Sequence, residues 1–371
     1  MKPVRLSFFV FWFGTILFFF AAASVASLFS GPLTSVSIKP LSKNIDMNDF
    51  FIRLFQSENH YFSHRSDLGW ESFANVSIRL LANIQPTDIR TFLGRELPGF
   101  SIFDTEIIIA GEGTDFTTLP VESAPPMEVL LKERELAEKQ LAHEKSEETP
   151  QAVGGEPSVF IYHTHSWESF KPLLDRERKT SEAVSSNEKL NVIAVGKMLS
   201  EELGKHGIAV RHDKTDITEK LQEKNWTYSR SYAVSREIIQ EAMAANRNLT
   251  YLIDIHRDAQ PKKVTTAVID GKNYARIYFI VGKEHKNYEN NLRLATKLHQ
   301  KLEEKYPGLS RGVFAKPKSA GNGIYNQDLS QQAMLIEFGG VDNNMEELQN
   351  TVEAFAEIFS EFYFEAEMVN G

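Results

Sequence analysis

Three groups of polar side chains each follow a short apolar run with the composition of a buried strand. His163 comes directly after SVFIY and His165 two residues later, Glu168 lies three residues after His165, His256 follows YLIDI, and Glu337 follows MLI. Two histidines and one carboxylate are the protein ligands of Zn²⁺ in several hydrolases, where the fourth position is left for water. The spacing therefore predicts a zinc site whose ligands are His165, Glu168 and His256.

A second carboxylate, that of Glu337, has a different expected role. Zn²⁺ lowers the pKa of its bound water from about 15.7 to about 7, and a nearby carboxylate can take the proton and pass it on. Asp254 and Asp258 flank His256, and a carboxylate often orients a ligand histidine, although Asp258 could equally pair with Arg257. We predict that the planar guanidinium of Arg257 binds a carboxylate of the substrate.

These side chains meet only if their strands lie in one sheet with their carboxyl ends at the same edge. From residue 158 onward, strand and helix patterns alternate. Strands are expected over 158–165, 208–213, 250–256, 275–282 and 332–340, and helices over 191–207, 232–246, 290–308 and 345–367. The alternation predicts an α/β domain with a mixed, mostly parallel sheet, helices on both faces, and a site at the carboxyl ends of the strands.

The first thirty residues predict a membrane anchor. Lys2 and Arg5 precede a long apolar run, and the next charge is Lys39. About 20 apolar residues are enough to cross a bilayer as a helix, and the positive flank places the N-terminus in the cytoplasm. Small residues at 21–26 also fit a cleaved signal peptide. We expect a single-pass protein of the cell membrane with its catalytic domain outside.

The remaining residues divide into regions of different composition. Residues 1–30 are the cytoplasmic tip and anchor, 40–117 a small α+β extracytoplasmic region, 118–157 a charged linker rich in Pro and Gly, and 158–371 the catalytic domain. The linker would let the catalytic domain reach away from the membrane surface.

Composition excludes several classes of protein. With 42% hydrophobic and 25% charged residues, the 371-residue chain is neither a polytopic membrane protein nor wholly disordered. The net charge of -9 argues against nucleic acid as the main partner. Cysteine is absent, which excludes disulfides, thiolate nucleophiles and cysteine-bound zinc. Any metal site must therefore use His and carboxylate ligands.

Several motifs, taken in order, resemble the stage II sporulation protein P (SpoIIP) family of endospore-forming bacteria. They are VFIYHTHSWESFKP, NVIAVGKMLSEELGKHGIAVRHDKTDI, YLIDIHRDA, GKNYARIYFIVG, YNQDLS and MLIEFGG. The resemblance covers residues 158–363, and the anchor fits the same layout. More distantly, the segment is similar to the zinc N-acetylmuramoyl-L-alanine amidases.

The resemblance implies a hydrolase of peptidoglycan. The bond cut would be the amide between N-acetylmuramic acid and L-alanine and, in this family, also peptide cross-links. The implied cofactor is Zn²⁺, and the implied partners are peptidoglycan, the membrane, and SpoIID- and SpoIIM-like sporulation proteins that act in engulfment of the forespore.

The resemblance leaves two ligand positions open. His163 or His165 matches the first histidine of the family, whereas His256 matches the second. The broader amidase pattern favours Glu188 as the ligand carboxylate. The HxxE spacing and the sporulation family favour Glu168, which we prefer. Glu337 matches the catalytic glutamate.

A further expectation concerns the substrate groove. Tyr325 and Asn326, from YNQDLS, would line a groove for the polymer or else belong to an ordinary loop.

The alternative to an enzyme is a wall-binding or adaptor module that keeps the amidase fold without cutting. The set of two His and two Glu at strand ends favours the enzyme, because a binding module has no need of it.

Overall fold

The computed structural model describes residues 105–122, 125–126, 128–134, 155–174 and 183–370. The predicted anchor and residues 40–104 lie outside this part of the chain, so both stay predictions. Among the described residues, no helix is both long enough and apolar enough to cross a bilayer. All described residues fall within one unit, residues 94–371.

The centre of the fold is a seven-stranded sheet with the order β1-β8-β7-β9-β4-β2-β3. The strands are β1 (Glu106–Ala110), β2 (Val159–Tyr162), β3 (Val210–His212), β4 (Tyr251–Asp258), β7 (Ile277–Gly282), β8 (Ser310–Lys316) and β9 (Gln332–Gly340). The pairs β2–β3, β2–β4, β4–β9 and β7–β8 are parallel, whereas β7–β9 and β1–β8 are antiparallel. The expected mixed, mostly parallel sheet is therefore confirmed.

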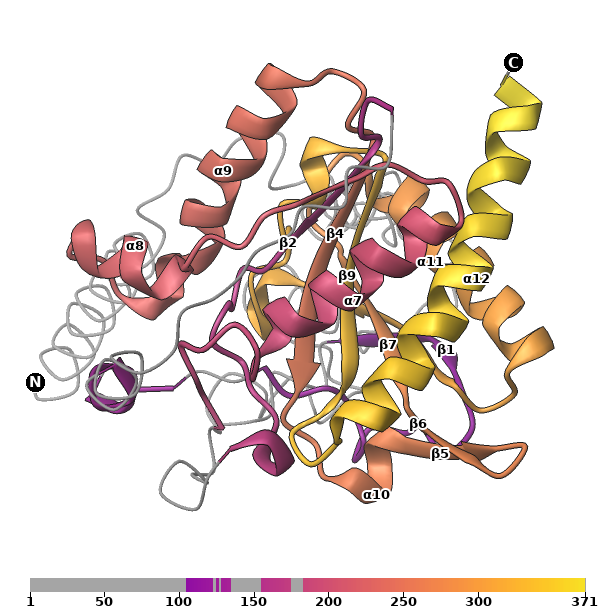
Figure 1. The fold of residues 1–371 in the computed structure, drawn as a ribbon, viewed down its shortest axis with the longest axis horizontal. Helices are drawn as coiled ribbons and strands as arrows, with labels where there is room; N and C mark the ends of the chain where they lie inside the picture. The colour runs from indigo at the N-terminus through magenta and orange to yellow at the C-terminus, as the bar shows by residue number, and fades with distance from the viewer. Residues whose placement is uncertain (1–104, 123–124, 127, 135–154, 175–182, 371) are drawn as a thin grey trace, which may run out of the picture. The chain divides into compact units, whose positions relative to one another are not determined.

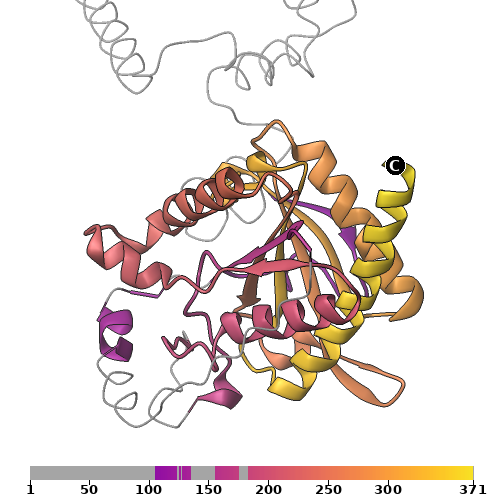
Figure 2. The same ribbon diagram turned by 45° about the horizontal axis from the view of Figure 1, so that its top comes forward.

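Helices cover both faces of the sheet, with α7, α11 and α12 on one face and α9 on the other (Figures 1 and 2). The helices are α7 (Val192–Lys205), α8 (Ile217–Glu223), α9 (Ser231–Ala245), α10 (Lys262–Thr265), α11 (Tyr288–Lys305) and α12 (Met345–Asn370). Short 3-10 turns, η3 to η6, occupy Lys171–Leu173, Tyr228–Arg230, Lys318–Ala320 and Gln327–Leu329. The hairpin of β5 (Thr266–Ile269) and β6 (Lys272–Ala275) forms a second, two-stranded sheet.

Alternation along β4 decides which face of the sheet carries the polar side chains. Ile253 and Ile255 belong to the large core that includes α7, α11 and α12, whereas Leu252 packs in the cluster that includes residues of α9. Because successive side chains on a strand point to opposite faces, Asp254 and His256 share the face of Leu252. The strand thus presents its acid and its histidine on the side of α9.

Two parts of the sheet differ from the sequence-based expectation. The strand β1 falls within the region 40–117 that we expected to be separate, but it pairs with β8 and so belongs to the same sheet as the strands after residue 158. The strand β8 was not predicted at all. Its sequence, SRGVFAK, mixes charged and apolar residues, and its burial depends on ion pairs between Arg311 and Asp258 and between Lys316 and Glu122. Both partners are distant in sequence, so no local pattern could reveal them.

Candidate metal centre

A turn after β2 and the last residues of β4 form the two sides of the candidate site. The turn is fixed to β4 through Asp254, whose carboxylate accepts hydrogen bonds from the Thr164 backbone N–H at 2.9 Å and from the Thr164 hydroxyl at 2.6 Å. Within the turn, the N–H of Glu168 donates to the carbonyl of His165 at 3.0 Å. These bonds carry His165 and Glu168 to the end of β4, where His256 lies.

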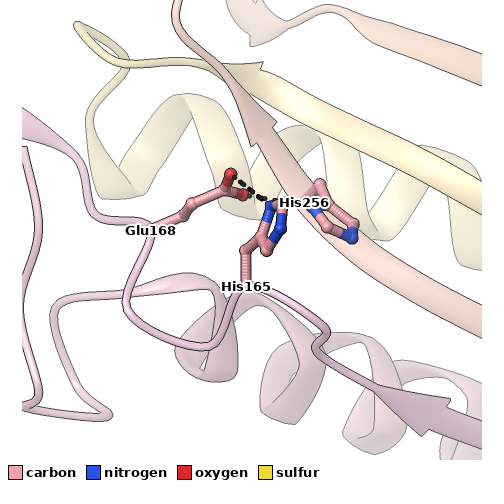
Figure 3. A group of neighbouring side chains, drawn as sticks. All are labelled: His165, Glu168 and His256. Carbon is pink, nitrogen blue, oxygen red and sulfur yellow. Dashed lines mark hydrogen bonds and ion pairs between the residues drawn. The ribbon is translucent and has the colours of Figure 1, made fainter. Parts of the chain in front are cut away.

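The side chains of His165, Glu168 and His256 point toward one another (Figure 3). Each offers one ligand atom, and these atoms lie within 4.8 Å of one another. The carboxylate of Glu168 approaches both rings, with Oε1 3.3 Å from Nδ1 of His165 and Oε2 3.4 Å from Nδ1 of His256. The backbone N–H of Arg257 donates to Glu168 Oε2 at 2.9 Å and holds the carboxylate in place. The donor set of two imidazoles and one carboxylate suits Zn²⁺.

The surroundings of His256 support this fit. The residue is fully buried, and among the described residues each ring nitrogen lies near a carboxylate oxygen without making a well-directed hydrogen bond. Its Nε2 lies 3.2 Å from Oδ1 of Asp254, on the side away from Glu168. Burial by itself lowers the pKa of His256, but the carboxylates of Asp254 and Glu168 raise it well above its usual value. A cation at Nδ1 would satisfy the ring and balance these carboxylates, with Asp254 orienting the imidazole.

Glu337 lies beside this group, because it is the parallel partner of His256 across the β4–β9 pair. The side chain is 1% exposed, and its Oε2 has no hydrogen-bond partner in the described part of the chain. Burial raises the pKa of Glu337 well above its usual value, the Glu168 carboxylate adds to the rise, and His256 opposes it. The charge of a bound dication would also oppose the rise. Such a carboxyl group is suited to holding and releasing a proton.

The two alternative ligands lie elsewhere. The ring of His163 packs against α7 beside Gly196, and its Nε2 is 2.8 Å from Nε2 of His212. Residues two apart face the same side only within a strand, and β2 ends at Tyr162, so the turn separates His163 from His165. Glu188 is half-buried in a turn before α7 and is not among the three grouped ligands.

The predicted substrate-binding residues are all enclosed. Arg257 is fully buried, and its guanidinium donates to the carbonyl of Ala183 at 3.3 Å. Tyr325 is also fully buried, and its hydroxyl donates to Oε1 of Glu122 at 3.2 Å. Asn326 donates to the carbonyl of Tyr232 at 3.1 Å. The substrate-binding roles of Arg257 and Tyr325 stay predictions.

Two tyrosines outside the predicted set of site residues pack on the histidines. The ring of Tyr228 stacks on His165 at 4.8 Å between centroids, and Tyr232 lies 5.5 Å from His165 and 6.3 Å from His256. The hydroxyl of Tyr232 is buried without a hydrogen-bond partner among the described residues. Their i,i+4 spacing is common in ordinary cores, so it could not distinguish them as site residues.

The fold and the site define an α/β domain with a buried His–Glu–His group suited to a divalent metal ion. The sequence model of the family described as Stage II sporulation protein P (SpoIIP) matches residues 87–360. A protein named Stage II sporulation protein P from Bacillus subtilis (strain 168) is 47% identical over 372 residues, covering 96% of this chain and 92% of that protein. The chain belongs to the stage II sporulation protein P family, which confirms the resemblance seen in the sequence.

Proposed function

We propose that this sporulation-family protein is a zinc-dependent hydrolase of peptidoglycan that cuts the amide between N-acetylmuramic acid and L-alanine. The observation that carries the proposal is the buried group of His165, Glu168 and His256 next to the carboxyl group of Glu337, whose Oε2 has no hydrogen-bond partner among the described residues. A group of ligands with an adjacent proton-transfer residue is the arrangement that metal-assisted amide hydrolysis requires.

Each residue of the site has a defined task in this proposal. His165, Glu168 and His256 hold the ion, and Asp254 keeps the ring of His256 in the ligating orientation. When bound, Zn²⁺ supplies a Lewis acid and lowers the pKa of its water. Glu337 accepts a proton on its carboxylate and returns it to the leaving amine.

The cellular setting is part of the same proposal. We place the protein in the cell membrane through its N-terminal helix, with the described domain outside and SpoIID- and SpoIIM-like proteins as partners in engulfment. Cleavage of peptide cross-links by the same site is a second reaction to test. The acidic balance of the chain means that binding to an anionic wall must depend on local contacts and not on net charge.

Release of dye from labelled, purified peptidoglycan by the full chain tests the proposed function. We expect release that stops with a chelator and returns when Zn²⁺ is added. Release that resists the chelator would contradict the zinc mechanism, and binding to the wall without any release would favour the non-catalytic wall-binding or adaptor module. Mass spectrometry of the products separates amide cleavage from cross-link cleavage.

A further inference from the structure

The candidate site is closed to a polymer. His165 is 6% exposed, and Glu168, His256 and Glu337 are at most 1% exposed. A peptidoglycan strand needs an open groove in order to bring its amide to these side chains. Part of the covering must therefore move before the proposed reaction can occur.

A short segment that precedes the predicted catalytic domain lies against the site. Residues 118–122, here named the strap, run beside the end of β4: the N–H of Val121 donates to Oδ1 of Asp258 at 2.9 Å, and the N–H of Ala259 donates to the carbonyl of Val121 at 3.1 Å. Leu119 is buried in a cluster that includes Tyr232. The side chain of Val121, by contrast, is 46% exposed, so the outer side of the strap faces solvent.

The strap ends with a carboxylate that reaches inward. Oε1 of Glu122 accepts a hydrogen bond from Lys316 at 2.6 Å and from the hydroxyl of Tyr325 at 3.2 Å. The ring of Tyr325 packs on Tyr232 at 5.3 Å, and Tyr232 in turn contacts the ligand histidines. Burial raises the pKa of Glu122, but Lys316 and then His165 lower it overall, which agrees with a charged carboxylate close to the site.

We propose that the strap is an internal blocker in which Glu122 occupies a carboxylate-binding position, formed by Lys316 and Tyr325, that the substrate uses once the strap has left. The inference rests on the proposed function, because stem peptides of the wall carry carboxylates. The strap forms no strand, and it is attached by separate hydrogen bonds at Thr118, Leu119, Val121 and Glu122, by two buried residues, Leu119 and Pro120, and by one ion pair. An anionic substrate competes for Lys316 with Glu122, whereas a neutral ligand does not.

The first experiment loosens the strap in the full chain with Glu122→Gln. Loss of the ion pair is expected to speed wall digestion about tenfold, since a hydrogen bond to a charged group is worth that factor or more. Hydrogen–deuterium exchange of residues 118–122 should rise as well, and this measurement needs neither metal nor activity. Glu128→Gln, at an exposed carboxylate in the same part of the chain, is the matched control and should change neither quantity.

The possible outcomes distinguish a failure of the blocker proposal from a failure of the proposed function. Slower digestion by Glu122→Gln would overturn the blocker, because Glu122 would then serve catalysis, and unchanged digestion with unchanged exchange would overturn it as well. If no variant digests the wall but exchange rises in Glu122→Gln, the strap is supported and the proposed hydrolase fails.

A disulfide that holds the strap in place tests the proposal in the opposite direction. The chain has no cysteine, so Val121→Cys combined with Ala259→Cys introduces the only thiols, at two residues whose backbones are hydrogen-bonded. Oxidation should slow wall digestion at least about tenfold, and a phosphine reductant should restore it, while the same treatments leave the cysteine-free parent unchanged. Equal digestion by the oxidised and reduced forms would overturn the blocker.

Lys316→Gln tests the carboxylate-binding position itself. The parent should prefer a soluble wall fragment with a free stem-peptide carboxylate over its amidated form in kcat/KM, and Lys316→Gln should reduce this preference about tenfold. A preference that survives in Lys316→Gln would show that Lys316 only holds the strap, which would overturn the assignment of the position to the substrate.

Discussion

His163 and His165 are separated by one residue, yet they lie in opposite environments on the two sides of the sheet. His165 contacts a carboxylate and a second histidine on the side of α9, whereas His163 contacts the ring of His212, the glycine of α7 and the backbone carbonyl of Ile255. Burial lowers the pKa of His163 to about 3 and that of His212 to about 2. Carboxylate neighbours, and not histidine alone, therefore distinguish a cation site from a neutral packing pair.

The largest difference is expected when the two histidines of the His-Thr-His motif are exchanged for alanine one at a time. His165→Ala should lose its bound zinc and fall to the background rate of wall digestion, because a ligand is removed. His163→Ala should keep its zinc, since His163 faces α7. Metal analysis of the purified variants checks both, and zinc loss in His163→Ala would contradict the division between the two sides.

Next in size is the effect of Glu337→Gln, which keeps the shape of the side chain but removes its proton transfer. Digestion should fall by about 10²–10⁴-fold, the usual range for a general acid–base group. The zinc content should stay at the level of the parent. Rates and metal content are measured on the same preparation, and retained digestion would exclude Glu337 from this role.

A smaller effect is expected for Asp254→Asn, which weakens the orientation of His256. Loss of a carboxylate behind a ligand histidine typically lowers metal affinity by about 10–100-fold. Competition with a chelator of known affinity measures the change. Asp328→Asn is the control, because Asp328 pairs with Arg236 away from the site; an equal loss of affinity in both variants would argue against a specific role of Asp254.

The smallest effect concerns the His163–His212 pair and pH. Both pKa values are lowered in the folded state, so below about pH 6.5 the unfolded chain binds protons that the folded chain does not, and the free energy of unfolding falls as pH falls toward 3. Each histidine contributes up to about 1.4 kcal/mol per pH unit. Denaturant titrations at several pH values from 7 to 5 give the free energy of unfolding at each pH. This free energy should fall less steeply with pH when both histidines are replaced by glutamine. An equally steep fall in the double variant would contradict the neutral pair.

Much of the fold followed from local pattern. The helix α7 illustrates why: Asn191 caps it by accepting from the N–H of Ile193 at 2.9 Å, apolar residues recur at helical spacing, and Gly207 follows with a φ of +83°. By contrast, β8 and the pairing of β1 depend on partners far along the chain. Their charged residues are buried because Asp258 and Glu122 meet them, and no window of sequence contains both partners.

In the candidate site, too, some features follow from the sequence and others only from the tertiary structure. The sequence by itself determined the residue types: without cysteine, only His and carboxylates could hold a metal, and their places after apolar runs indicated His165, Glu168, His256 and Glu337. Only the tertiary structure shows that His165 and not His163 joins Glu168 and His256, and that Glu122 pairs with Lys316. The physical reason is that the turn after β2 and the strap are set by hydrogen bonds to β4, across 90 and 137 residues of sequence, and not by local propensity.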